Sequence, residues 1–357
     1  MSEIYRRRRA ELAAVLEPEA ALITRLVNVR YLTGLASSNA AVLVYADGRD
    51  AVLCTDGRYS GTAARVSSDL EIVVERSVAA TLTARAVKDG LYTLGFEGHD
   101  LTWEQHQDLY GSQRLLEAVP LGRAVEDLRM VKDEEEIALL RRACAITDRA
   151  LAAVLPVIEP GMTERQIAVQ LERNMIDLGA DGIAFESIVA SGPNGAVPHH
   201  SPGHWPLADG DLITMDFGAM VGGYHADMTR TVALGRVSSW QQEIYDLTRQ
   251  AQQAGIDAAV VGADVAAVDA AARDLIKAAG YGDCFPHGLG HGVGLEIHEA
   301  PLLGYDKTGK LGDRVPVTAE PGVYLAGRGG VRIEDTLVVR ASGPELLTQT
   351  TKELLVL

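Results

Sequence analysis

Short apolar runs alternate with helical stretches over roughly the first third of the chain. The helical stretches include SVAATLTARAVKD (77–89) and TWEQHQDLYGSQ (102–113). Strands that alternate with helices are typical of a mixed sheet covered by helices. We therefore expect a mixed α/β domain over residues 1–125. Its predicted strands are ALITRLVNVRYL (21–32), AVLVYA (41–46), DAVLCT (50–55), LEIVVE (70–75) and YTLGFE (92–97).

Long amphipathic segments dominate the rest of the chain. The first, residues 131–155, carries Asp133 with Glu136 three positions later, which is the signature of a capping box at a helix start. Strong signals are sparse over residues 119–133, so we expect a second domain over residues 130–357. Its other predicted helices run from Met162-Thr163-Glu164 to Gly179, over 240–260 and over 264–280.

Two aspartates flank a predicted hairpin in MDFGAMVGGYHADMTRT (215–231). In a regular hairpin centred on the Val221–Gly222 bond, Asp216 and Asp227 face each other across the strands. Two bare carboxylates about 5 Å apart repel each other, so the pair favours a shared cation. A single strand-end Asp more often caps a turn, and only the pairing shifts the balance toward metal binding.

Two glutamates repeat this arrangement in TAEPGVYLAGRGGVRIEDT (318–336), where a glycine-rich turn separates two short strands. Glu320 and Glu334 fall near opposite positions, and the strand that carries Glu334 looks largely buried. Buried acids need partners. In HGLGHGVGLEIHE (287–299), three histidines lie among four glycines, which indicates close-packed backbone around a site.

These segments resemble the dinuclear-metal peptidases of the pita-bread fold: Xaa-Pro aminopeptidase (aminopeptidase P), Xaa-Pro dipeptidase (prolidase) and methionine aminopeptidase. The resemblance extends to SGPNGAVPHH (191–200) and, more weakly, to NVRYLTGL (28–35), CTDGRY (54–59) and LGFEGHDLT (94–102). It implies an α+β protein whose pita-bread catalytic domain, a curved antiparallel sheet with helices outside, follows a ribonuclease-H-like N-terminal domain.

Residues 312–322 depart from the family pattern. Arg314 stands where the family usually has Gly, and Pro316 where it usually has an apolar strand residue. Because proline cannot donate to a strand ladder, we expect this strand to be locally an edge or irregular.

The resemblance implies a role for each ligand of a two-metal centre. Asp216 would chelate one ion, Asp227 and Glu334 would bridge both, and His291 with Glu320 would complete the second. An oxygen-rich set favours Mn²⁺, although Co²⁺ or Zn²⁺ also fit such ligands. Two adjacent ions activate a water at neutral pH, and Glu320 is the candidate to pass its proton to the leaving nitrogen.

The resemblance also places His199 and His298 as donors to the tetrahedral oxyanion. His287 would orient His291 or the substrate. Arg332 would hold a carboxylate ligand or the substrate's C-terminal carboxylate. For His200, where many relatives carry an aromatic residue, a surface or packing role is the better interpretation.

Charge and composition exclude several classes of function. A net charge of −16 argues against a nucleic-acid partner. The basic run Arg6–Arg9 is interpreted as the solvent side of a first helix and not as a secretory signal, and no apolar run approaches a membrane span. Three scattered cysteines (Cys54, Cys144, Cys284) suit a reducing cytoplasm.

Three functions compete. The first is hydrolysis of Xaa-Pro bonds in proline-containing peptides; we favour the aminopeptidase type, with a prolidase restricted to dipeptides as the alternative. The second is a creatinase-like C–N hydrolase, and the third a non-catalytic peptide-binding module. Both are disfavoured because their relatives lack the ligands present here. The resemblance also implies a homodimer or homotetramer.

Overall fold

The computed structural model describes residues 2–111 and 116–357. It divides into two compact units, Met1–Arg129 and Met130–Leu357. Within the described residues, no helix has the length and apolar content needed to cross a membrane.

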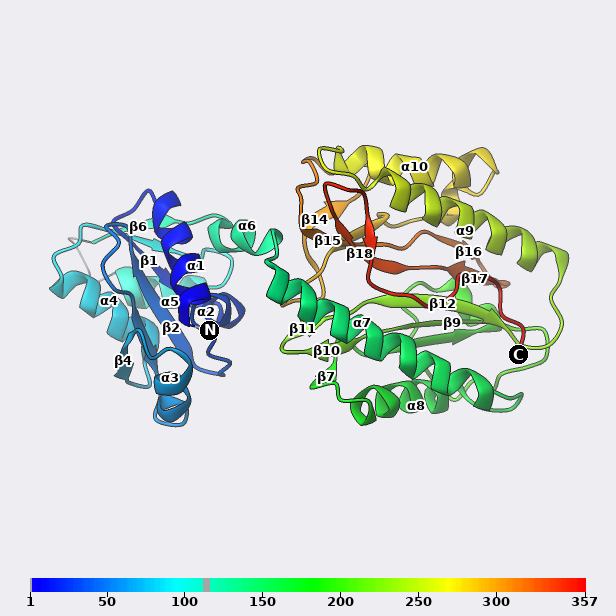
Figure 1. The fold of residues 1–357 in the computed structure, drawn as a ribbon, viewed down its shortest axis with the longest axis horizontal. Coiled ribbons are helices and arrows are strands. Elements are labelled where there is room, and N and C mark those ends of the chain that lie inside the picture. The colour runs from blue at the N-terminus through cyan, green and yellow to red at the C-terminus, as the bar shows by residue number, and fades with distance from the viewer. Residues whose placement is uncertain (1, 112–115) are drawn as a thin grey trace. The chain divides into compact units, whose positions relative to one another are not determined.

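The first unit is a six-stranded mixed sheet with helices, in the strand order β4-β3-β2-β1-β5-β6 (Figure 1). Neighbours β1/β2 and β2/β3 are antiparallel, whereas β3/β4, β1/β5 and β5/β6 are parallel. The strands are β1 (Ala20–Ile23), β2 (Ala40–Tyr45), β3 (Val52–Thr55), β4 (Glu71–Val74), β5 (Thr93–Phe96) and β6 (Glu117–Pro120). The helices are α1 (Ser2–Val15), α2 (Leu26–Thr33), α3 (Ser60–Val66), α4 (Val78–Lys88), α5 (Trp103–Tyr110) and α6 (Ala124–Met130).

The predicted strand over residues 21–32 is wrong in its second half, which forms helix α2. Val29, Leu32 and Thr33 are buried at helical spacing, and Gly34 ends the helix in the left-handed conformation, with φ 79°. The run was apolar enough for a strand, but its period is that of a helix. Helix α6 was not predicted, and residues 112 and 113 of the predicted segment 102–113 lie outside the described residues.

The basic run of α1 is only partly a solvent face, so that interpretation is wrong for Arg8 and Arg9, which are buried. The Arg8 guanidinium lies 4.2 Å from the ring centre of Tyr31 and donates to the Tyr31 carbonyl at 3.2 Å. Arg9 donates to the Leu32 carbonyl at 2.7 Å and pairs with Asp69. These arginines therefore attach α1 to α2.

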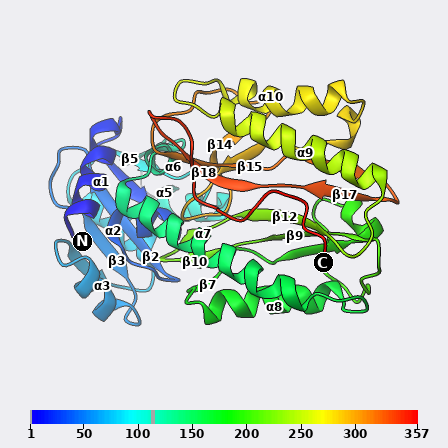
Figure 2. The same cartoon turned by 45° about the vertical axis from the view of Figure 1, so that its right-hand side comes forward.

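In the second unit, helices lie on both sides of antiparallel strands. Helices α9 (Ser239–Ala258) and α10 (Val265–Ala278) lie on one side, and α7 (Glu134–Val154) and α8 (Glu164–Asp177) on the other (Figures 1 and 2). The predicted capping box is confirmed: Asp133 accepts from Glu136 N at 3.0 Å, and Glu136 accepts from Asp133 N at 2.9 Å. Three 3₁₀ helices are η1 (Leu155–Val157), η2 (Gly192–Ala196) and η3 (Gly282–Cys284).

The strands of this unit pair in four small antiparallel sheets: β11-β10-β7, β12-β9-β8, β14-β13-β15-β18-β19 and β16-β17. The first part of the unit holds β7 (Gly182–Ile183), β8 (Ile188–Ser191), β9 (Leu212–Phe217), β10 (Ala219–Val221), β11 (Tyr224–His225) and β12 (Met228–Ala233). The second part holds β13 (Gly290–Gly292), β14 (Glu299–Leu303), β15 (Val315–Ala319), β16 (Gly322–Leu325), β17 (Gly329–Arg332), β18 (Asp335–Val339) and β19 (Glu345–Leu346).

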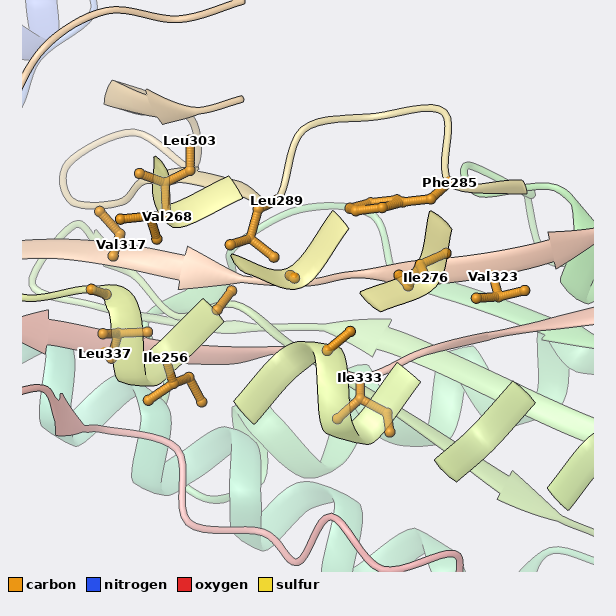
Figure 3. Close-up of a cluster of buried hydrophobic side chains, with 14 of the residues drawn as sticks. Ile256, Val268, Ile276, Phe285, Leu289, Leu303, Val317, Val323, Ile333 and Leu337 are labelled. Carbon is orange, nitrogen blue, oxygen red and sulfur yellow. The ribbon is translucent and has the colours of Figure 1, made fainter. Parts of the chain in front are cut away.

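Apolar side chains of α9 and α10 pack against the second group of strands and form the core there (Figure 3). Ile256 and Ile276 come from the helices, and Val317, Val323 and Leu337 from the strands. Burial of such apolar area is the main contribution to stability. This core holds strands β15–β18 in place, and with them Glu320 and Glu334.

Pro316 lies in an inner strand of its sheet, but at a position where that strand is locally an edge, which confirms the prediction. Strand β15 is third in its five-stranded sheet, and Pro316 lies opposite Val338 of β18. Strand β13 pairs with β15 only at Gly292 and Val317, so Pro316 lies outside that ladder. A proline is tolerated because the neighbouring strand is so short.

Arg314 adopts a left-handed backbone conformation, with φ 62°. A non-glycine residue there carries strain of about 1 kcal/mol or more. This explains physically why a glycine is usual at this position in the family.

We predict that Arg314→Gly raises the melting temperature by about 1–2 °C, because the relieved strain exceeds the entropy that glycine adds to the unfolded chain. Gly327→Ala is the matched reverse control. Gly327 has φ 74° and no atom within 4 Å of an added Cβ, so alanine there should lower the melting temperature through strain alone. A lower melting temperature for Arg314→Gly, measured by calorimetry, would contradict the argument.

Candidate metal centre

The aspartate hairpin has a different register from the predicted one. Strand β9 pairs with β12 so that Asp216 lies opposite Thr229, two residues beyond Asp227. The turn is Gly222-Gly223, with φ values of 61° and 84°, and not Val221-Gly222. A two-residue turn of this type needs positive φ at both central positions, which glycine adopts freely and valine does not.

The two aspartates still meet, because Asp227 lies two residues from the partner of Asp216 and is therefore its diagonal neighbour on the same face of the hairpin. A Cβ added to Gly218 would lie 1.8 Å from the Ala226 carbonyl oxygen, so only glycine allows the two segments of the hairpin to approach this closely. Asp227 precedes β12 and lies outside the ladder. Burial, and then the charge of Asp216, raise the pKa of Asp227 well above its usual range.

The glutamate pair has the predicted register. Ala319 pairs with Asp335 on one side, and Gly322 with Arg332 on the other. Glu320 and Glu334 lie at the intervening opposite positions. Burial, and then the charges of Asp227 and Glu320, raise the pKa of Glu334 well above its usual range.

His291, in β13, completes the cluster. Its Nε2 lies 3.5 Å from Asp227 Oδ2 and 3.4 Å from Glu320 Oε1. Its Nδ1 lies 3.0 Å from the Gly292 carbonyl oxygen, which can only accept a hydrogen bond. Nδ1 therefore carries a proton, which leaves Nε2, the nitrogen that faces the acids, as the atom that would bind a metal ion.

The donor atoms of this cluster fit divalent cations. Ligand atoms of Asp227, His291 and Glu334, all buried, lie within 4.8 Å of one another. Neither Asp216 Oδ1 nor Glu334 Oε1 has a hydrogen-bond partner among the described residues, although both atoms are buried. Buried acids of like charge either take up protons or bind metal, so these side chains have the composition and the orphaned oxygens of a metal centre.

Arg332 and Thr229 hold the carboxylates in place. Arg332, 3% exposed, donates to Asp216 Oδ2 at 2.7 Å and to Thr229 Oγ1 at 3.1 Å. Thr229 Oγ1 in turn donates to Glu334 Oε2 at 2.7 Å. Of the two roles expected for Arg332, the geometry supports the one that holds a carboxylate ligand.

His287 does not contact His291 through a hydrogen bond among the described residues, so its expected role as the orienting partner of His291 is not what the structure shows. Its Nδ1 donates to the Gly288 carbonyl at 2.8 Å, and its Nε2 accepts from Tyr324 Oη at 2.9 Å. Burial lowers the pKa of His287 to about 4, so the ring is neutral.

The cluster opens into a cavity of about 650 Å³. His199 and His298 line it, together with the metal-centre side chains. His298 packs edge-on against His291, with ring centres 4.4 Å apart, and burial lowers its pKa. Arg332 and His287 also line the cavity, so all nine predicted site residues border one space.

Several supporting residues were not predicted. Thr229 was seen only as part of a motif, and Lys132 and Glu164 gave no signal. Lys132 is buried and donates at 2.8 Å to Oε2 of Glu299, the residue that follows His298 in the sequence. Glu164, also buried, accepts from His200 at 2.8 Å. A single buried ion pair of distant residues leaves no local pattern, so the sequence could not reveal them.

Known proteins share these features. Residues 138–341 match metallopeptidase family M24, and residues 7–131 match the creatinase/prolidase N-terminal domain. The chain is 40% identical over 264 residues to the Xaa-Pro dipeptidase of Pyrococcus furiosus, which covers 74% of this chain and 75% of that protein.

Solved structures agree. The Xaa-Pro dipeptidase from Bacillus anthracis matches over 100% of both chains, with 35% identity and a TM-score of 0.95. The X-Pro aminopeptidase from Thermotoga maritima matches over 97% of this chain and 99% of that one, with 32% identity and a TM-score of 0.90. These likenesses confirm the predicted pita-bread fold class and its N-terminal domain type. The chain belongs to metallopeptidase family M24 and is a hydrolase.

Proposed function

We propose that this protein is a dinuclear-metal exopeptidase that hydrolyses Xaa-Pro dipeptides. The sequence favoured the aminopeptidase type, but relatives named Xaa-Pro dipeptidase or prolidase support the alternative better. The observation that carries the proposal is the set of four carboxylates near His291, three of them buried, that line one cavity.

The five ligand candidates would hold two ions, with Mn²⁺ favoured and Co²⁺ or Zn²⁺ as alternatives. Bound there, the ions would polarise the scissile carbonyl and activate a water. The side chains assigned to this role are Asp216, Asp227, His291, Glu320 and Glu334.

Glu320 is assigned to proton transfer because it is the acid of the cluster that is more open to the cavity. Its side chain is 18% exposed, against 6% for Asp227. Thr318 Oγ1 donates to Glu320 Oε1 at 3.3 Å, which leaves Oε2 to receive a proton and pass it to the proline nitrogen. His199 and His298, on the cavity wall, are assigned to the developing oxyanion.

Creatinase-like and non-catalytic functions are disfavoured, because relatives of those kinds lack the ligand set that is complete here. A cytoplasmic location and a homodimer or homotetramer remain part of the proposal. The three free cysteines support the first, and the family resemblance supports the second.

Substrate length tests the function. With the metal-loaded protein, we expect hydrolysis of Ala-Pro but little or none of Ala-Pro-Ala-Ala, because a dipeptidase requires the free carboxylate next to proline. The measurement is proline or alanine release under matched conditions. Faster cleavage of the tetrapeptide would restore the aminopeptidase interpretation, and cleavage of neither would remove the Xaa-Pro assignment.

Metal removal tests the centre. A strong chelator should abolish Ala-Pro hydrolysis, and added Mn²⁺ should restore it. Asp227→Asn should bind fewer than two ions per chain and stay inactive at any Mn²⁺ concentration, while remaining folded because it removes a repelling charge. Asp209→Asn, at an exposed surface pair with Arg236, is the control. Full metal content and activity in Asp227→Asn would contradict the bridging role.

Thr229→Val should lower metal affinity by about 10–100-fold, the usual effect of losing a side chain that orients a ligand. The valine removes the hydroxyl that donates to Glu334 and accepts from Arg332. Thr229→Ser keeps the hydroxyl and should retain affinity. Competition with a metal-binding dye measures both variants, and equal affinities for them would show that Thr229 acts only through packing.

A further inference from the structure

The buried carboxylate of Glu164 lies outside the metal centre and belongs to none of the groups assigned to metal binding or proton transfer. Glu164 begins helix α8, has no exposed surface and is not among the residues that line the cavity. Its Oε1 accepts from Ser191 N at 2.8 Å and Asn194 Nδ2 at 2.9 Å, and its Oε2 accepts from Gly203 N at 3.3 Å. Burial alone would raise the pKa of Glu164, but these hydrogen bonds and that of His200 hold it below its usual range, so the group is a carboxylate.

His200 connects this carboxylate to the cavity. Its Nε2 lies 2.8 Å from Glu164 Oε2, and its ring is part of the cavity wall. Nδ1 is not among the buried side-chain atoms that lack a partner, and no hydrogen bond joins it to another described residue. The second ring nitrogen is therefore accessible to solvent or to a ligand.

The other basic groups of the cavity are already engaged. Four of the five N–H donors of Arg332 are engaged by Asp216, Thr229, Tyr324 and a backbone carbonyl. His287 is neutral and bonded at both nitrogens, and His291 faces the acids.

Three basic groups remain beside His200, and each is less suited to bind the substrate's carboxylate. His199 is already assigned to the developing oxyanion. Burial and the neighbouring His291 lower the pKa of His298, which favours its neutral form. Lys307 is half-buried and pairs with its neighbour Asp306 at 2.9 Å. Among the cavity's described basic side chains, His200 combines a hydrogen bond to a buried carboxylate with a second ring nitrogen that no other described residue engages.

We infer that His200, oriented by Glu164, receives the free carboxylate of the proline-containing dipeptide. This rests on the proposed dipeptidase function and identifies its selectivity determinant. With Nε2–H donated to Glu164 and Nδ1–H donated to the substrate, the ring is an imidazolium between two carboxylates, and both hydrogen bonds are charge-assisted. An amide or a continuing peptide bond brings no such charge, so it gains less from the same contact.

The experiment compares Ala-Pro with Ala-Pro-amide in the metal-loaded enzyme. In His200→Phe, the aromatic type usual in the family, the ratio of kcat/KM for Ala-Pro to that for the amide should fall by about tenfold or more. His204→Phe is the matched control, since His204 is an exposed histidine of the same loop that does not line the cavity, and its ratio should stay at the wild-type value.

Glu164→Gln tests the orienting role. Glutamine keeps the size and one acceptor oxygen but removes the charge, so the same ratio should fall while metal content and circular dichroism stay as in the wild type. Folding of each variant is checked by its melting temperature.

Each outcome has one meaning. An equal loss of kcat/KM for Ala-Pro and for Ala-Pro-amide in His200→Phe, or an unchanged ratio of the two, would overturn only the assignment of His200. A purely structural contact between His200 and Glu164 would affect both substrates alike. Wild-type enzyme that cleaves the amide as well as Ala-Pro would overturn this inference together with the dipeptidase proposal.

Discussion

Repulsion between buried carboxylates is the constraint on which the catalytic unit depends. The neighbouring residues Glu334 and Asp335 show how the fold treats such charges in two ways. Asp335 is buried, yet Arg230 and Lys352 outweigh the effect of burial and lower its pKa. Glu334, one residue earlier, has an orphaned oxygen and a raised pKa. The fold supplies a cation to one acid and leaves the other for a ligand ion.

Such a cluster needs a rigid frame, because buried like charges move apart wherever the backbone permits. Two antiparallel ladders in the same register, on either side of Glu320 and Glu334, provide it. The apolar core beneath α9 and α10 holds these ladders in place (Figure 3). Arg332 then spans from the glutamate hairpin to Asp216 in β9, which couples the two halves of the site.

The same principle recurs at the cavity wall. Glu164 is buried without a metal, and the loop over residues 191–203 surrounds it with N–H donors and with His200. A buried acid is thus satisfied in three ways in one unit: by an arginine or lysine, by a set of hydrogen bonds with an imidazole, or by ligand ions. Each gives the acid a different chemical use.

The sequence by itself determined the helix start at Asp133 and the facing of Glu320 and Glu334, because each depends on residues close in the chain. It also singled out the five candidate ligands, through the local motif around each. It did not determine the register of the aspartate hairpin, although the need for two positive-φ residues at Gly222-Gly223 was readable. Only the tertiary structure decided the partner of Arg332, the burial of Arg8 and Arg9, and the pairs Glu164–His200 and Lys132–Glu299. These contacts join residues far apart in sequence, and their energies arise from burial, which no local pattern encodes.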